Sequence, residues 1–118
     1  MNEVELKLRT KRFSLRVIKL VGALPRNVEG RAIGNQLVRS GTSVGANYRA
    51  ACRGRSKAEF ISRLGVVEEE ADESAFWMEM IIDSGLMEQK LVEPLLKEAN
   101  ELVAIITASR ITASKNKI

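Results

Sequence analysis

Basic side chains are the residues of this sequence whose type and spacing could do chemistry. Residues 1–55 hold 12 Lys and Arg against 3 Asp and Glu, whereas residues 56–118 hold 7 against 12, so the two halves carry net charges of +9 and −5. A basic stripe on a helix binds phosphate groups, pairs with an acidic protein surface, or is only a solvated face. The candidates for contact with nucleic acid are a stripe of Arg12, Arg16 and Lys19, a second stripe of Arg39, Arg49 and Arg53, and Arg55 in the turn beyond.

Nucleophilic catalysis finds little support in the sequence. There is no His, so no imidazole can activate the thiol of the single Cys, Cys52. Ser40 and Ser43 have no Lys at helical spacing that could act as their base. We therefore interpret Cys52 as a small packed residue and predict that the protein is not an enzyme.

Metal and nucleotide sites are disfavoured as well. Glu68, Glu69 and Glu70 are adjacent, and successive residues of a helix point about 100° apart, so these carboxylates cannot converge on one ion. Gly41 and Gly45 do not form the Gly-x-x-x-x-Gly-Lys-Ser/Thr loop that cradles phosphates. We predict no metal, no cofactor and no small-molecule substrate.

Four apolar repeats must position the basic residues. They predict helices over about 5–24, 28–53, 57–83 and 88–113, with breaks at Pro25, Gly54 and Ser84-Gly85. Short connections between long helices predict a single domain that spans residues 1–118. We expect it to fold as an all-α antiparallel up-down-up-down four-helix bundle. The inward-facing residues we expect are Leu6, Thr10, Phe13, Val17, Leu20 and Leu24; Ile33, Leu37, Val44, Tyr48 and Ala51; Phe60, Leu64, Val67, Ala71, Ser74, Met78 and Ile81; and Leu91, Leu95, Ala99, Leu102, Ile106 and Ala113.

The second predicted helix carries an unusual run of small residues from Ser40 to Ala46. Loop propensity would place a break there, but the apolar and basic residues on either side keep helical spacing through it. Each Gly costs such a helix about 1 kcal/mol relative to Ala. We expect the close approach of another helix backbone at Gly41 and Gly45 to offset this cost.

Helix ends can be predicted from capping residues. Asn27 is a plausible N-cap for the second helix, and Ser56 with Glu59 forms a Ser-x-x-Glu capping box for the third. The start of the fourth helix is left open by Pro94. Proline costs a helix little stability in its first turn, but it causes a kink if the helix begins near Met87.

Some apolar residues lie away from the predicted core. Leu8, Leu15 and Ile18 share the outer face of the first helix, where a monomer has little use for them, so they indicate contact between subunits. Trp77 lies on the flank of the third helix, where an indole more often closes a contact between helices or subunits than stacks on a base.

The chain also resembles the four-helix-bundle proteins encoded in intervening sequences of bacterial 23S ribosomal RNA genes. The resemblance covers about residues 6–108 and departs from the family pattern at Tyr48-Arg49-Ala50. It implies an up-down bundle, assembly as a ring-like pentamer, and a largely unassigned biochemical role. The motifs that carry it are Arg39-Ser40-Gly41-Thr42-Ser43-Val44-Gly45-Ala46-Asn47, Arg55-Ser56-Lys57-Ala58-Glu59-Phe60, and Glu70-Ala71 followed by Phe76-Trp77-Met78-Glu79.

Two functions remain open on the sequence. The first is an oligomeric protein that binds ribosomal RNA, or other RNA or DNA, through the basic surface of its first two helices. The second is an assembly or adaptor module whose basic half meets an acidic partner. No apolar run approaches the length of a membrane span, and no signal sequence is evident, so we expect a cytoplasmic protein with no membrane contact.

Overall fold

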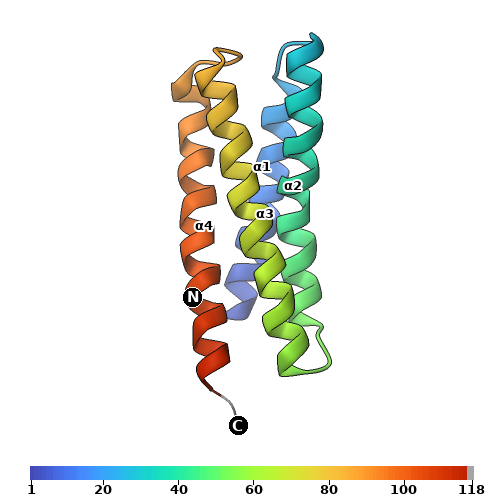
Figure 1. Cartoon of the computed structure of the whole chain (residues 1–118), viewed down its shortest axis with the longest axis vertical. Coiled ribbons are helices and arrows are strands. Elements are labelled where there is room, and N and C mark those ends of the chain that lie inside the picture. The colour runs from blue at the N-terminus through green and yellow to red at the C-terminus, as the bar shows by residue number, and fades with distance from the viewer. Residues whose placement is uncertain (117–118) are drawn as a thin grey trace.

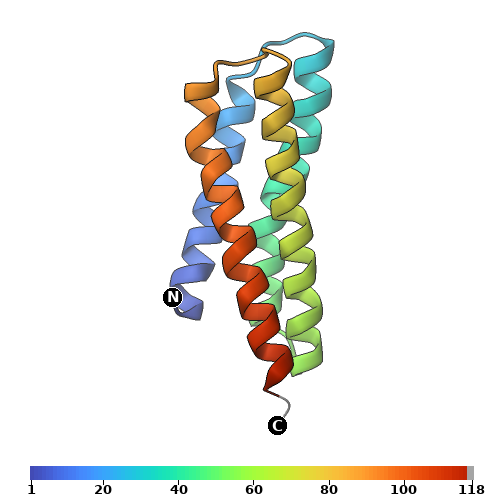
Figure 2. The same ribbon diagram turned by 60° about the vertical axis from the view of Figure 1, so that its left-hand side comes forward.

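The computed structural model describes residues 1–116 and confirms an all-α four-helix bundle. Helix α1 spans Glu3–Gly22, α2 spans Val28–Cys52, α3 spans Lys57–Asp83 and α4 spans Gln89–Lys115. Consecutive helices run antiparallel, with short connections at alternate ends of the bundle (Figures 1 and 2). Residues 117–118 of the predicted domain lie outside the described residues.

The order of the helices around the bundle decides which faces meet. Within residues 1–116, α2 packs against α1 and α3, and α3 packs against α4, whereas α1 and α4 pack least closely of the neighbouring pairs. Helices α1 and α3 are not neighbours and lie on opposite corners of the bundle. Their exposed faces point in opposite directions.

The predicted core is largely confirmed. Phe13, Val17, Leu37, Val44 and Met78 belong to the fully buried set, contributed by α1, α2 and α3. In α4 the seam begins at Val92 and not at the predicted Leu91, whose side chain is 58% exposed. The reason is spacing, because Val92, Leu95, Ala99, Leu102 and Ile106 alternate in steps of three and four residues, which keeps them on one face. Leu20, Ile33, Phe60 and Ala113 are only partly buried.

The predicted caps are present, with one shift. The Asn27 side chain accepts a hydrogen bond from the Gly30 N–H at 2.7 Å. Ser56 Oγ accepts from the Glu59 N–H at 3.1 Å, but the Glu59 carboxylate accepts from the Arg55 N–H, one residue before the expected partner. Helix α4 begins at Gln89, so Pro94 is its sixth residue and lies inside the helix beyond its first turn.

The small residues of α2 bring it close to α1, as predicted. A Cβ added at Gly41 would lie 2.5 Å from Val17 Cγ1, and one added at Gly45 would lie 2.8 Å from Ser14 Oγ. Ser14 Oγ donates a hydrogen bond to the Gly41 carbonyl oxygen at 2.8 Å and accepts one from the Gly45 N–H at 3.2 Å. This hydroxyl fixes the register of the two helices.

Helix α2 is joined to α3 by a polar pair within the core. Ser40 Oγ and Ser74 Oγ lie 2.9 Å apart, and both side chains are fully buried. Ser74, the polar member of the predicted α3 seam, therefore has its partner on α2. The pair holds α2 to α3 at the turn next to the small residues that hold it to α1.

Candidate nucleic-acid interface

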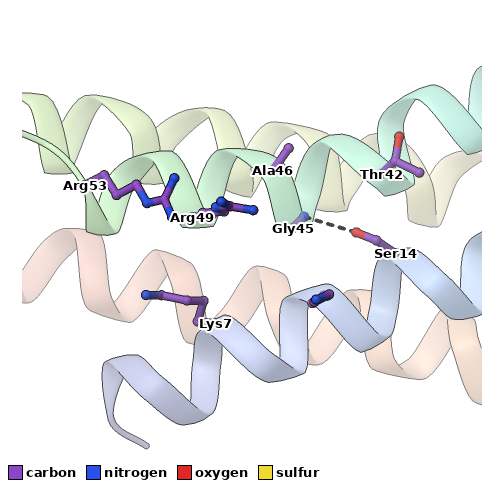
Figure 3. A pocket seen from close by; sticks show the side chains of 8 residues that line it. Lys7, Ser14, Thr42, Gly45, Ala46, Arg49 and Arg53 are labelled. Carbon is purple, nitrogen blue, oxygen red and sulfur yellow. Dashed lines mark hydrogen bonds between the residues drawn. The ribbon is translucent and has the colours of Figure 1, made fainter.

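A groove between α1 and α2 collects basic side chains from both helices. It has a volume of about 390 Å³. Figure 3 shows Lys7 of α1 and Arg53, the C-cap of α2, at the same end of the gap, with Arg49 next along α2. Its lining consists of Lys7, Lys11 and Ser14 from α1, and Thr42, Gly45, Ala46, Arg49 and Arg53 from α2.

The register of the two helices pairs the basic residues across this groove. Ser14 contacts Gly45, and the helices run antiparallel, so moving along α1 toward its N-terminus corresponds to moving along α2 toward its C-terminus. The Cβ position of Gly45 lies 3.4 Å from Lys11 Cα, so the backbone of Lys11 comes level with Gly45, one helical turn from Arg49. Because side chains lean toward the N-terminus of their own helix, those of Lys11 and Arg49 lean toward each other in this antiparallel pair, and so do those of Lys7 and Arg53. We call these two combinations the inner pair and the outer pair.

The floor of the groove exists because its residues are small. Gly45 approaches the α1 backbone, with a Cβ position 3.2 Å from the Thr10 carbonyl oxygen. Ala46 beside it is exposed. Larger residues at these positions would separate the helices or fill the space between the basic walls.

The basic residues of the groove have no acidic partners within the described part of the chain. Ion pairs there involve Arg9, Arg39, Lys90 and Arg110, and none includes Lys7, Lys11, Arg49 or Arg53. Four positive charges therefore line one groove without a salt bridge among residues 1–116, an arrangement that attracts anions.

The structure distributes the predicted site residues over several places. Arg49 and Arg53 line the groove, whereas Arg39 turns the other way and pairs with Glu70 and Glu73 of α3. The predicted stripe on α2 is therefore divided between its two neighbours. Arg12 is exposed on α1 and Arg55 lies in the connection between α2 and α3.

Arg16 and Lys19 border a different groove, at the opposite end of α1. It lies between α1 and α4, has a volume of about 580 Å³, and is lined mainly by apolar residues such as Leu20, Leu91 and Leu95. These two cations therefore do not join Arg49 and Arg53 in one site.

Sequence reasoning missed Lys7 and Lys11. Both were counted in the basic half, but neither belongs to the stripe formed by Arg12, Arg16 and Lys19. The available signal was their spacing of four residues, continued by Ser14 three residues later, on the face of α1 that meets the small residues of α2. Recognising it required the register between the two helices.

The other sequence features have structural partners. The Glu68 carboxylate accepts a hydrogen bond from Arg110 at 2.8 Å, whereas Glu70 pairs with Arg39, so the adjacent carboxylates diverge as expected. Burial raises the pKa of the half-buried Cys52 thiol, which keeps it protonated at neutral pH.

The Trp77 side chain can be used to test whether Arg39 pairs with Glu73. Its indole N–H donates a hydrogen bond of 3.0 Å to the Glu73 carboxylate, and this carboxylate also pairs with Arg39. The Trp77 hydrogen bond lowers the pKa of Glu73, burial opposes this shift in part, and Arg39 adds to it. Because the folded pKa is depressed, the stabilisation is present above the unfolded pKa of about 4.3 and is lost as the pH falls through the lower folded value.

We expect an acid titration of Trp77 fluorescence to have its midpoint below pH ~4.3, the ordinary pKa of a Glu. Trp77 is the only Trp, so the signal is unambiguous. Arg39→Ala should raise the midpoint, whereas Arg110→Ala, which releases Glu68, should leave it unchanged. Circular dichroism recorded in parallel separates titration from unfolding. An unshifted midpoint in Arg39→Ala would show that Arg39 does not engage Glu73.

Comparison with known proteins agrees with the fold. The chain is a four-helix bundle, and it belongs to the 23S rRNA-intervening sequence protein family, whose model matches residues 2–108. It is similar to the crystal structure of a protein of unknown function from the S23 ribosomal protein family of Bacteroides thetaiotaomicron VPI-5482. The two share 27% identity and a TM-score of 0.86, over 93% of this chain and 98% of the other.

Two further findings concern the curated proteins and the membrane. No curated protein gives a match to the sequence. None of the helices within residues 1–116 combines the length and apolar character needed to cross a membrane.

Proposed function

We propose that this protein binds the phosphate backbone of nucleic acid in the groove between α1 and α2, without strong preference for base sequence. The observation that carries this proposal is the convergence of Lys7, Lys11, Arg49 and Arg53 on one cavity, with no acidic partners among the described residues. Solvated cations scattered over a surface would not need a floor of small residues between them.

Lysine and arginine supply complementary contacts in such a groove. The Arg guanidinium presents a planar set of donors that matches phosphate oxygens in pairs, whereas the Lys ammonium acts as a mobile point charge. Each pair across the groove combines one of each kind. The association of the family with 23S rRNA genes makes RNA the first ligand to test, although the geometry of the groove is the basis of the proposal.

Binding is tested most simply with the unmodified protein and a fluorescein-labelled RNA of mixed sequence. Fluorescence anisotropy at low salt should show binding, and the affinity should fall linearly on a logarithmic scale as salt is added, because phosphate contacts release counterions. DNA of the same sequence should bind comparably. The absence of binding to either polymer at low salt would refute the proposal.

A second function, assembly with other subunits, is favoured by a different observation. Leu8, Leu15 and Ile18 lie on the outer face of α1, and their exposed fractions are 47%, 57% and 49%. Arg16 and Lys19, which border the groove between α1 and α4, flank this row. We call this the basic face.

Helix α3 carries the complementary surface on the opposite corner of the bundle. Phe76 and Met80 are 50% and 38% exposed, and the exposed acids around them are Glu69, Asp72, Glu79 and Asp83. We call this the acidic face. Contact between the two faces in successive subunits would be head-to-tail, and such contacts form a ring when the rotation from one subunit to the next closes.

We expect a homo-oligomer, with the pentamer favoured by the family resemblance, in which repeated grooves would strengthen weak nucleic-acid contacts through avidity. Leu15→Glu should dissociate it by placing a carboxylate opposite the acidic face. Val28→Glu is the matched control, since Val28 is 75% exposed but lies outside both faces. Light scattering with size-exclusion chromatography measures the outcome. A monomeric unmodified protein at micromolar concentration would contradict assembly.

A further inference from the structure

We propose that the groove holds two neighbouring phosphates of a single unpaired strand, one at the inner pair and one at the outer pair, with the bases directed away from the protein. This inference rests on the proposed function and makes it specific. It concerns the number of phosphates bound, the kind of strand accepted and the part of the nucleotide that is recognised.

The spacing of the pairs supports two phosphate sites. Lys7 and Lys11 are four residues apart on α1, and Arg49 and Arg53 are four apart on α2. At 1.5 Å rise per residue, the inner and outer pairs are about 6 Å apart along the groove. Neighbouring phosphates of a compact, A-form-like strand have a comparable separation, so each phosphate can meet one Lys and one Arg at the same time.

The shape of the groove favours an unpaired strand. Its walls are two adjacent helices in contact at Gly45 and Ser14, so the space of about 390 Å³ between them admits one sugar-phosphate chain. Both walls are basic, which allows a strand lying between them to be contacted from two sides. A duplex is a wide convex cylinder, and its backbone would meet the rims of the groove without entering it.

The absence of an aromatic platform supports recognition of the backbone only. Proteins that hold single strands by their bases stack them on exposed aromatic rings. The nearest aromatic residue along α2 is Tyr48, which is 3% exposed and belongs to the core. The exposed ring of Phe76 lies on α3, which α2 separates from α1. The groove lining contains no aromatic ring on which bases could stack, so affinity should depend little on sequence.

The first test compares strands of equal length. We expect single-stranded RNA 12-mers of uridine, cytidine and mixed sequence to bind within about threefold of one another, and at least tenfold more tightly than a 12-base-pair RNA duplex at the same salt concentration. A duplex that binds as tightly as the single strands would overturn the inference and leave the proposed function standing. Failure of every polymer to bind would remove both.

The second test counts the phosphates. The logarithmic salt slope for a single strand is about −0.7 per phosphate neutralised, so two phosphates predict about −1.4 per groove. Lys7→Ala with Arg53→Ala removes the outer pair, and Lys11→Ala with Arg49→Ala removes the inner pair. Each double variant should halve the slope and retain the residual binding of one phosphate.

Competition by short fragments completes the count. The dinucleotide pUpU, with two phosphates, should displace a labelled 12-mer, whereas uridine monophosphate should do so at least tenfold less effectively. If loss of one pair left the slope unchanged, or if the monophosphate competed as well as pUpU, the two-site arrangement would be wrong. Circular dichroism confirms that each variant, altered only at exposed positions in the helices and at the C-cap of α2, remains folded.

Discussion

Arg49→Ala combined with Arg53→Ala is expected to weaken RNA binding at least tenfold, a loss of about 1.4 kcal/mol or more. Both guanidinium groups line the groove between α1 and α2 and lack acidic partners among the described residues. Charge-assisted hydrogen bonds are worth about 1.5–3 kcal/mol each, and exposure to water reduces that contribution. Anisotropy titrations at one fixed salt concentration provide the measurement.

Two controls separate local contacts from total charge. Lys90→Ala with Lys97→Ala removes the same charge from exposed positions of α4 and should change the affinity less than threefold. Arg39→Ala should also have little effect on binding, because its guanidinium pairs with Glu70 and Glu73. If the α4 variant weakens binding as much as the α2 variant, the effect is one of net charge and the groove is not the site.

Gly41→Ala is expected to destabilise the bundle by about 1–3 kcal/mol, the usual cost of overpacking, although alanine has the better helix propensity by about 1 kcal/mol. The new Cβ would lie 2.5 Å and 2.7 Å from the two γ carbons of Val17 and 2.9 Å from its Cβ. Val17 is fully buried and β-branched, so it cannot rotate away. Gly41→Leu should be worse, because it adds three more carbon atoms to the same contact.

Gly65→Ala is the matched control for this substitution. Gly65 lies inside α3, and a Cβ added there meets nothing within 4 Å. Gly65→Ala should raise the melting temperature, because only the helix propensity changes, whereas Gly41→Ala should lower it. A Gly41→Ala protein that melts at or above the temperature of the unmodified protein would show that α1 and α2 are not in close contact.

The fold could be predicted because its signals are local and repetitive. The seam of α3 and the caps at Asn27 and Ser56 are patterns within single helices, and they require no knowledge of neighbouring helices. Gly41 and Gly45 could also be interpreted, because a helix with so little side-chain bulk needs compensation. The misplacement of Leu91 shows the limit, since a shift of one residue in a seam changes which side chain is buried.

The candidate site was harder to predict because it depends on contacts between helices. Arg39 and Arg49 share one basic stripe in sequence, yet one faces α3 and the other faces α1. Lys7 and Lys11 gain their significance from the register set by Ser14 and Gly45, which no single helix reveals. A helical repeat predicts that a residue is exposed, but the neighbouring helix decides which charges are neutralised and which remain free.

Nuclear magnetic resonance mapping of backbone amides tests the central claim most directly. A uniformly ¹⁵N-labelled protein would be titrated with an unlabelled single-stranded RNA at low salt. The account predicts that the largest shift changes cluster along the groove, at residues 7–14 of α1 and 42–53 of α2, and disappear at high salt. Changes centred on Arg16 and Lys19 at the other end of α1, or on the acidic face of α3, would contradict it.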